Sequence, residues 1–269
     1  MRQQPSCSLI ISTYNSPNYL RCCLQSALRQ RVLPDEIVIA DDGSGDETKK
    51  VIDEITAISP VPIIHVWQPD EGFQLSRIRN KAIAQSSGEY IINIDEDIIL
   101  NKYFIHDHLR LARRGCFIAG KRAFLSSAAT KKYIDNTYSL SFFTRSLKKK
   151  QNAFRCLWIT RLYCRIRRTC SPAEYVTGCN MAFWRNDLLQ VNGYNENFHG
   201  WGGEDCDIAI RLINAGIHVQ FIQCYAVAFH LDHPVRNLSR IHDNDRLFRQ
   251  ALKEKITYIE QGIDKHITA

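Results

Sequence analysis

Short apolar runs alternate with amphipathic stretches through the first hundred residues, and this alternation restricts the possible folds most strongly. The apolar runs fall at residues 8–12, 36–40, 63–67 and 90–94, and the stretches between them repeat apolar residues at helical spacing. Strands that alternate with helices in this way predict βαβ units and a parallel sheet. A parallel strand is buried on both faces, so it consists of nearly continuous apolar residues. We therefore predict an α/β protein, a single domain with a mostly parallel central sheet flanked by helices.

Polar residues stand directly after three of these predicted strands. They are Thr13, Tyr14 and Asn15, then Asp41 and Asp42, and finally Asp95, Glu96 and Asp97. With right-handed crossovers, the carboxyl ends of parallel strands lie along one edge of the sheet, where α/β proteins bind ligands. Three converging polar ends predict a nucleotide-sized crevice. Taken alone, the last triplet is better explained as a turn, because short motifs match many unrelated sequences.

Two carboxylates one residue apart, Asp95 and Asp97, form a hard, oxygen-rich site at such an edge. Oxygen ligands of this kind suit Mg²⁺ or Mn²⁺ that holds a substrate diphosphate. No Gly-x-Gly-x-x-Gly follows the first strand, which disfavours a Rossmann dinucleotide site. The sequence also lacks Gly-x-x-x-x-Gly-Lys-Ser/Thr, which disfavours a P-loop enzyme.

Composition and cysteine usage are those of a protein from a reducing compartment. The 269 residues contain no apolar run near the ~20 residues of a membrane span, and no signal-peptide pattern precedes the first strand. We therefore expect a cytoplasmic protein, with the inner face of the cytoplasmic membrane as a peripheral location. The ten cysteines form no Cys-x-x-Cys pair, so we expect free thiols, mostly in the core, and no zinc site.

The net charge of +7 arises from one segment. Residues 144–168 contain nine Lys or Arg and no acid, which leaves about −2 for the rest of the chain. Apolar residues are interleaved with these charges: Leu147, Phe154, Leu157, Trp158, Ile159, Leu162 and Ile166. This pattern favours a basic amphipathic helix that rests on an anionic membrane surface. A solvated surface loop is the alternative, and nucleic-acid binding has no supporting motif.

Five motifs in sequence order resemble those of a family 2 glycosyltransferase with the GT-A (Rossmann-like) fold. Four lie in the first half, at residues 10–15, 41–44, 79–82 and 95–97. The fifth, Phe-His-Gly-Trp-Gly-Gly-Glu-Asp at 198–205, resembles the acceptor-side motif of β-1,4-galactosyltransferases and bacterial chondroitin-type polymerases. Its Trp-Gly-Gly-Glu-Asp run is specific, whereas Asp-x-Asp alone is weak.

The resemblance implies roles for residues on the donor side. Thr13 and Tyr14 would line the nucleotide pocket, and Asp42 would hydrogen-bond the uracil edge. Arg79 would lie near the nucleotide or its phosphates. Asp95 would contact the ribose or the metal. These roles imply a UDP-sugar donor.

The resemblance also implies a divalent cation, Mn²⁺ or Mg²⁺. Asp97 would bind it, with Asp95 as a further ligand, and His230 at a strand end would complete the metal shell. The cation would offset the charge that builds on the departing diphosphate. A hydrogen-bonded core histidine is the alternative explanation of His230.

On the acceptor side, the resemblance implies that Asp205, with Glu204 beside it, is the general base. Trp201 would offer a flat face to a pyranose ring, and Gly203 would let the chain approach the sugar closely. The alternatives are an acid that stabilises a helix N-terminus and a tryptophan of the core. Cys206 departs from the galactosyltransferase pattern, where an acid is usual, and this puts the acceptor contacts in doubt.

Together these roles imply an inverting, metal-dependent glycosyltransferase that moves a sugar from a UDP-sugar to a glycan or lipid-linked glycan, in capsule or lipopolysaccharide synthesis. An inactive carbohydrate-binding relative and a sugar nucleotidyltransferase are the alternatives. The second lacks a Gly-rich, basic phosphate loop after the first strand. We divide the chain into a nucleotide-sugar half (1–120), a basic insertion (121–173), an acceptor and catalytic half (174–235) and a helical tail (236–269).

Overall fold

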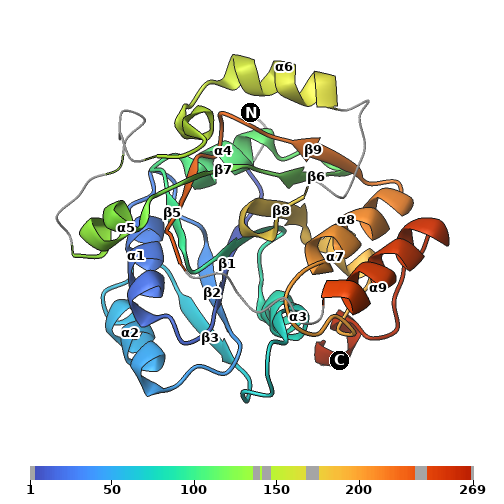
Figure 1. Ribbon diagram of the computed structural model, residues 1–269, viewed down its shortest axis with the longest axis horizontal. Coiled ribbons are helices and arrows are strands. Elements are labelled where there is room, and N and C mark those ends of the chain that lie inside the picture. Colours follow the sequence, from blue (N-terminus) through green and yellow to red (C-terminus); the bar gives the residue numbers. More distant parts are fainter. Residues whose placement is uncertain (1–3, 136–139, 141–146, 168–175, 234–240, 268–269) are drawn as a thin grey trace.

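A seven-stranded sheet forms the centre of the protein, in the strand order β3-β2-β1-β4-β8-β6-β9 (Figure 1). The structure, a computed structural model, describes residues 4–135, 140, 147–167, 176–233 and 241–267. The strands are β1 (Cys7–Thr13), β2 (Glu36–Asp41), β3 (Ile63–Trp67), β4 (Tyr90–Asp95), β6 (Cys116–Ala119), β8 (Met181–Trp184) and β9 (His218–Phe221). Strands β1 to β4 are parallel, β8 is antiparallel to both neighbours, and β9 is parallel to β6. The predicted α/β fold with a mostly parallel sheet is confirmed.

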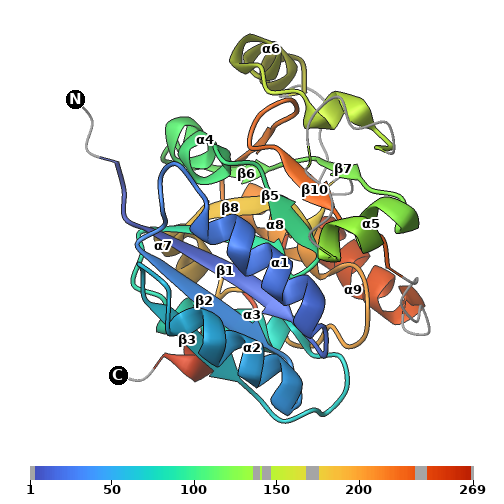
Figure 2. The same cartoon turned by 90° about the vertical axis from the view of Figure 1, so that its left-hand side faces the viewer.

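Helices cover both faces of this sheet, as Figures 1 and 2 show. One face packs against α1 (Pro17–Leu28), α2 (Asp46–Thr56) and α4 (Phe104–Leu111). The other packs against α3 (Leu75–Gln85), α7 (Arg185–Gln190), α8 (Glu204–Asn214) and α9 (Ile241–Lys253). Every residue of β1 and β2 is buried, which explains why these strands are written as continuous apolar runs.

A second, three-stranded sheet joins segments that are far apart in the sequence. Its strands are β5 (Ile98–Leu100), β7 (Arg122–Phe124) and β10 (Ala228–His230), in the order β5-β10-β7. The β10–β5 pair is antiparallel and places His230 opposite Ile98. His230 therefore lies beside Asp97, the residue that precedes β5.

The basic segment contains the predicted helix, although the helix is shorter than the charged stretch. Helices α5 (Ser127–Ile134), η1 (Lys150–Ala153) and α6 (Leu157–Arg167) lie between β7 and β8. Helix α6 is amphipathic and packs on the outside of β9, at the top of Figure 1. Residues 136–139, 141–146 and 168–175 lie outside the described residues.

The C-terminal segment departs in part from the helical tail that the sequence predicts for residues 236–269, of which the structure describes 241–267. Helix α9 ends at Lys253, and only a 3-10 turn, η4 (Ile263–His266), follows. Between them the backbone bonds to the body of the protein. Asn192 Nδ2 donates to the carbonyl of Ile259 at 2.7 Å, and Glu196 N donates to the carbonyl of Gln261 at 3.0 Å. These long-range hydrogen bonds replace the hydrogen bonds of a helix. The local spacing of apolar residues does not predict them.

Two further expectations concern cysteines and membranes. The nine cysteines in the described part of the chain are all free thiols, as predicted. Within the same residues, no helix combines the length and the apolarity needed to cross a bilayer.

Candidate active site

The carboxyl ends of β1, β2 and β4 lie side by side, as the sequence predicts. Thr13 is in register with Asp41, and Asp95 ends β4 on the other side of β1. Thr13 is buried, and its Oγ1 has no hydrogen-bond partner among the described residues. An orphaned buried hydroxyl at a strand end is the kind of group that a ligand completes.

Asp42 is buried, and both of its carboxylate oxygens already accept hydrogen bonds. Gln68 Nε2 donates to one at 2.6 Å, and the backbone N–H of Gln74 donates to the other at 2.8 Å. Burial raises the pKa of Asp42, and these two donors oppose that rise. Tyr14, by contrast, is exposed, and its hydroxyl donates to Asp70 at 2.8 Å. Asp42 therefore orders the edge of the predicted nucleotide pocket, and Tyr14 stands at its surface.

Arg79 lies between Asp95, at the end of β4, and Asp205, at the start of α8. Its guanidinium is 1% exposed and donates to Asp205 at 2.9 Å, to Asp95 at 3.0 Å and to Ser12 Oγ at 3.2 Å. Glu204 is a fourth neighbour, with its Oε1 3.7 Å away. Burial alone would lower the pKa of Arg79, but the carboxylates around it, led by Asp205, raise it. A permanently charged guanidinium thus holds acids from two motifs in one geometry.

Asp205 and Glu204 occupy the first turn of α8. The backbone N–H of Gly178 donates to Asp205 Oδ2 at 2.8 Å, while Arg79 donates to Oδ1, so both oxygens of that carboxylate are held. Glu204 is buried, and its Oε2 has no partner within the described part of the chain. Burial raises the pKa of Glu204 to about 8 and raises the pKa of Asp205, while Arg79 acts in the opposite direction on both. The two acids therefore hold protons more readily than free carboxyls.

Gly178 touches Asp205 so closely that a methyl group does not fit. A Cβ at this position meets the carboxylate oxygens of Asp205 at 2.2 Å. We expect Gly178→Ala to push Asp205 off its backbone donor and to lower the rate of sugar transfer by roughly 10-fold or more, because such misplacement disturbs reacting geometry. Steady-state kinetics beside a thermal melt checks this. An unchanged rate in a folded variant contradicts the positioning of Asp205 by Gly178.

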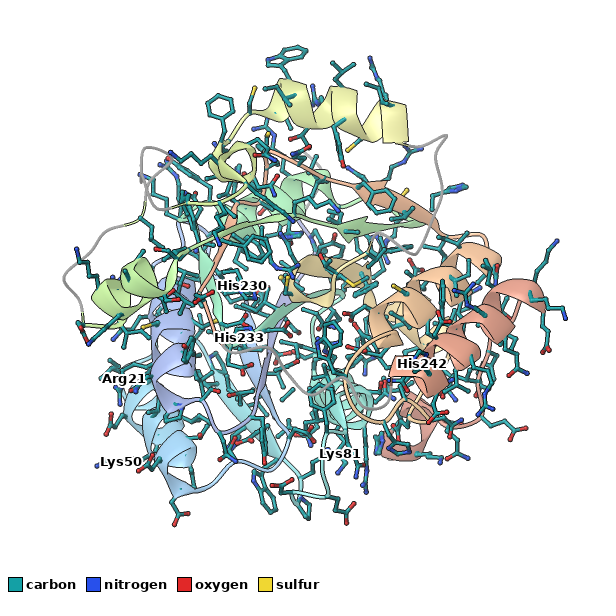
Figure 3. The ribbon with its side chains drawn as sticks, viewed as in Figure 1. Arg21, Lys50, Lys81, His230, His233 and His242 are labelled. Atoms are coloured by element: carbon teal, nitrogen blue, oxygen red, sulfur yellow. The ribbon has the colours of Figure 1, made fainter. Side chains whose placement is uncertain are left out.

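Asp97, His230 and His233 form a cluster with metal-binding chemistry. Figure 3 labels its two histidines. One ligand atom from each lies within 4.8 Å of the others. The Nε2 atoms of His233 and His230 are 2.9 and 3.3 Å from Asp97 Oδ2. Asp97 is buried, whereas Asp95 does not belong to the cluster and is bound by Arg79 instead. The role of Asp95 as a metal ligand stays a prediction.

The three-stranded sheet places the two histidines beside Asp97. His230 ends β10 opposite β5, and His233 follows three residues later. Burial lowers the pKa of His230, although Asp97 opposes that shift, so the imidazole is kept neutral as a metal ligand requires. His233 is not among the residues that the sequence predicts as metal ligands. The His-x-x-His spacing after a strand was the signal that could have found it.

One pocket of about 840 Å³ unites the predicted metal, catalytic and acceptor residues. Its walls include Arg79, Asp95, Asp97, Trp201, Gly203, Glu204, Asp205 and His230, together with Cys206 and His233. Thr13, Tyr14 and Asp42 are not among its lining residues and lie at the adjoining strand ends. Helix α9 supplies a further wall through Asp245, Phe248 and Arg249, which the sequence did not indicate.

Trp201 lies in a loop that α9 holds in place. The Trp201 side chain is half-exposed on the pocket wall. Buried Asn244 on α9 donates to the carbonyls of His199 and Gly202 at 3.2 and 2.8 Å. Gly202 and Gly203 have φ angles of 100° and 95°, which disfavour any other residue. These glycines serve the turn that enters α8, so their conformation by itself accounts for them.

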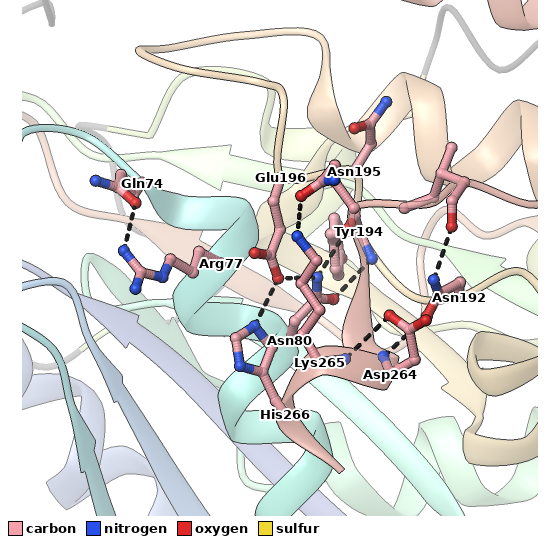
Figure 4. Close-up of polar contacts among 12 residues, drawn as sticks. Gln74, Arg77, Asn80, Asn192, Tyr194, Asn195, Glu196, Asp264, Lys265 and His266 are labelled. Atoms are coloured by element: carbon pink, nitrogen blue, oxygen red, sulfur yellow. Dashed lines mark hydrogen bonds and ion pairs between the residues drawn. The ribbon is translucent and has the colours of Figure 1, made fainter.

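A polar cluster behind Arg79 supports this geometry (Figure 4). The guanidinium of Arg79 lies 5.3 Å from the ring centre of Tyr194. Asn80 exchanges two hydrogen bonds of 2.7 Å with the backbone of Tyr194. Glu196 accepts from Asn80 at 2.8 Å and contacts His266 Nε2 at 2.7 Å. The C-terminal turn therefore braces the helix that carries Arg79.

Two family profiles together cover most of the chain. Residues 8–166, more than half of the sequence, match glycosyl transferase family 2. This chain belongs to glycosyl transferase family 2. The region 161–234 matches the N-terminal domain of galactosyltransferase. This region of the chain contains the Trp-Gly-Gly-Glu-Asp run. The predicted family, and with it the predicted glycosyltransferase class of enzyme, is confirmed.

The family 2 chain is similar to longer bacterial synthases. It is 24% identical to the chondroitin synthase of Escherichia coli and 24% identical to that of Pasteurella multocida, over 96% and 97% of its own length. A hyaluronan synthase of Pasteurella multocida is 25% identical over 98% of the chain. The chain spans only 39%, 29% and 29% of these relatives.

Solved structures share the fold of the family 2 chain. A mannosyltransferase from Pyrobaculum calidifontis in complex with GDP-Man and Mn²⁺ superposes with a TM-score of 0.63 at 16% identity, covering 99% of this chain and 68% of that one. Residues 1–349 of TarS from S. aureus, in complex with UDP, give the same TM-score and identity, covering 97% and 69%.

Proposed function

We propose that the chain transfers a sugar from a UDP-sugar to a hydroxyl group with inversion, in the presence of a divalent cation. The observation that carries this proposal is the division of one pocket into two acidic centres. Asp97 and two histidines form the first, and Glu204 and Asp205 form the second. Arg79 links the second centre to Asp95, the residue at the end of β4.

The first centre fits a cation that is bound together with substrate oxygens. Asp97, His230 and His233 offer one carboxylate and two imidazole ligands. Imidazole ligands favour a transition ion such as Mn²⁺ over Mg²⁺, which prefers oxygen. The bound cation would supply electrostatic stabilisation of the leaving diphosphate. The three residues leave positions on the ion for that diphosphate, because they are too few to fill its coordination shell.

The second centre supplies the base. In a single displacement, one carboxylate suffices to take the proton of the attacking hydroxyl on the face of the sugar opposite the diphosphate. We assign this role to Asp205, because Gly178 and Arg79 fix its orientation within the pocket. Burial and the neighbouring Asp205 raise the pKa of Glu204 to about 8, so Glu204 keeps its proton to a higher pH than a free carboxyl.

The acceptor side fits a saccharide. Half-exposed Trp201 offers an apolar face at the pocket wall, and Asp245 and Arg249 on α9 offer polar partners to hydroxyl groups. Cys206 lies in the same wall. The similarity to chondroitin and hyaluronan synthases supports a glycan or lipid-linked glycan acceptor in bacterial surface polysaccharide synthesis, in capsule or lipopolysaccharide.

The alternatives fit the pocket less well. An inactive carbohydrate-binding relative has no need of an acid at position 205 that is held by a backbone N–H and a buried guanidinium. A nucleotidyltransferase needs basic groups around the attacked phosphate. The loop after β1, Tyr14 to Ser16, supplies no basic side chain, and the buried guanidinium of Arg79 is bonded to acids.

A thermal-shift panel tests the donor. We expect UDP-sugars with Mn²⁺ to raise the melting temperature by about 5–10 °C at 100 times the Kd, since binding then adds ~2.7 kcal/mol to the free energy of unfolding. GDP-sugars and UDP-sugars with EDTA are the matched controls. Release of UDP in the presence of an acceptor measures transfer. Equal shifts with GDP-sugars, or none with any nucleotide sugar, contradict the proposed donor.

A further inference from the structure

Helix α6 presents an apolar stripe to the outside of the protein. Trp158 and Leu162, one helical turn apart, are 78% and 59% exposed, and Ile159 beside them is 45% exposed. Scattered apolar side chains on a surface need no explanation, but a contiguous set on one helix face marks an interaction site. Figures 1 and 2 show this helix at the outer rim of the molecule, away from α1, α2 and α3.

The opposite face of α6 is fixed to the body of the protein. Thr160 is fully buried and its hydroxyl donates to the carbonyl of Gln223. Cys164 Sγ donates to the carbonyl of Phe221 at 3.0 Å, one helical turn further on. Residues 160 and 164 thus hold one face against the end of β9, so the stripe of residues 158 and 162 must face outward.

An ion pair anchors the start of the helix. Arg155 donates to both oxygens of fully buried Asp107 at 2.7 and 2.6 Å. Its guanidinium also lies 4.2 and 4.9 Å from the ring centres of Tyr103 and Tyr225. These contacts neutralise Arg155 and tie the start of α6 to the body of the protein, so the helix is already formed before a partner covers the stripe.

Exposed cations lie on α6 beside the stripe and in the segment that precedes the helix. Arg161 and Arg165 on α6 and Lys148, Lys149 and Lys150 before it are exposed. The guanidinium of Arg161 lies 5.8 Å from the ring centre of Trp158, at the edge of the stripe. No acid occurs between residues 144 and 168 to oppose them. The surface therefore combines apolar side chains with uncompensated positive charge.

We propose that the outer face of α6 docks on the surface of an anionic lipid bilayer, with Trp158, Ile159 and Leu162 among the acyl chains and Arg161 and Arg165 among the headgroups. The charge complementarity between this cationic rim and anionic headgroups selects the partner. A helix of 11 residues is about 16 Å long, too short to span a bilayer but sufficient to lie in its interface. This docking is independent of the proposed sugar transfer.

Vesicle flotation with the full chain tests the proposal. We expect the protein to float with vesicles of phosphatidylcholine and phosphatidylglycerol, and not with phosphatidylcholine alone. Added salt should weaken the binding, since it screens exposed charges. Tryptophan emission should shift to the blue on binding, and this shift should disappear in Trp158→Phe. Absence of binding to the anionic vesicles overturns the proposal.

Variants with matched controls separate the two contributions. Arg161→Gln with Arg165→Gln should weaken partition roughly 30-fold, because each basic residue near an anionic surface contributes about 1 kcal/mol. Lys50→Gln on α2, a residue labelled in Figure 3, with Lys253→Gln on α9 removes the same charge from other surfaces and should leave the partition near that of the parent. If the arginine and the lysine double variants bind anionic vesicles equally well, the specific role of α6 is overturned.

The apolar stripe needs its own pair of variants. Trp158→Ser with Leu162→Ser should abolish flotation, whereas Ile58→Ser, at a residue that is also 78% exposed but lies beyond α2, should not change it. Thermal melts and nucleotide-sugar hydrolysis in solution should be unchanged in all of them. Sedimentation velocity tests whether a second copy of the chain covers the stripe instead. If the parent is a dimer that does not bind vesicles, and only the Trp158→Ser, Leu162→Ser variant is a monomer, the proposal is overturned and the stripe is a dimer interface.

Discussion

Replacement of Asp205 by Asn is expected to lower kcat for sugar transfer by about 10²–10⁴-fold, the usual contribution of a general base. The amide keeps the size of the side chain and can still accept from Arg79, which lies 2.9 Å from Asp205. It cannot take a proton from the acceptor. Binding of Mn²⁺ and of the donor should be retained, because the Asp97 cluster does not include Asp205. Steady-state kinetics and calorimetric titration with Mn²⁺ and UDP separate the two effects.

The pH dependence of the parent enzyme provides a second readout of the same carboxylates. Burial raises the pKa of Asp205 and raises that of Glu204 to about 8, while Arg79 opposes both shifts. A raised pKa means that the proton is taken up at a higher pH, so the basic form is lost as the pH falls through that value. The acidic limb of kcat/KM should therefore lie well above the ~4 of a free carboxyl. Because the two acids interact, the limb belongs to the pair.

Two neighbouring acids are matched controls for Asp205→Asn. Glu204→Gln should retain most of the transfer rate. Asp207, on the same helix, pairs with fully buried Arg211 at 2.8 Å, so Asp207→Asn should lower the free energy of unfolding by about 3–5 kcal/mol and leave chemistry intact in the folded fraction. If Asp205→Asn retains sugar transfer and Glu204→Gln loses it, Glu204 is the general base and Asp205 is not. Full activity in both Asp205→Asn and Glu204→Gln excludes these two acids as the general base.

Asp97→Asn should weaken Mn²⁺ binding by ~100-fold or more, since even outer-shell changes cost 10- to 100-fold. The reason is the loss of the one carboxylate that lies between two imidazoles, whose Nε2 atoms are 2.9 and 3.3 Å away. Transfer should fall with it, and treatment of the parent with EDTA should reproduce the loss. Metal binding measured by electron paramagnetic resonance, together with the Mn²⁺-dependent thermal shift, checks the expectation.

Asp232→Asn is the control for the metal variant. Asp232 stands between the two histidines in sequence and lines the same pocket, but its carboxylate accepts from Ser127 and does not belong to the metal-binding cluster. This variant should bind Mn²⁺ like the parent, whereas His233→Ala should resemble Asp97→Asn. Equal Mn²⁺ affinity in all three variants excludes the cluster as the metal site.

The sequence predicted the frame of the fold because burial leaves a local record. Strands β1, β2 and β4 are buried on both faces, and their continuous apolar runs show it residue by residue, whereas β3 at the edge of the sheet is only partly buried. The same record failed in the C-terminal segment, where α9 stops at Lys253. There the backbone of residues 259 and 261 bonds to Asn192 and Glu196, and a bond to a distant residue has no periodic signature.

The types and order of residues in the sequence predicted several of the side chains that belong to the pocket. They did not predict which of these side chains contact one another. Asp97 and Asp205 follow from motifs that each occupy a few consecutive residues. The approach of His233 to Asp97 needs the β10–β5 pairing of chain segments more than a hundred residues apart. Arg79, predicted near the nucleotide, also bonds to Asp205 across 126 positions of sequence.

By itself, then, the sequence determined the α/β architecture, the polar edge at three strand ends, the family and the cationic character of residues 144–168. The tertiary structure alone decided that Arg79 bridges Asp95 and Asp205, that His233 joins His230 at Asp97, and that Trp158 and Leu162 face outward. The physical reason is that local patterns record whether a residue is buried and in which element it lies. Which groups meet depends on how distant elements pack, and that information is held by the chain as a whole.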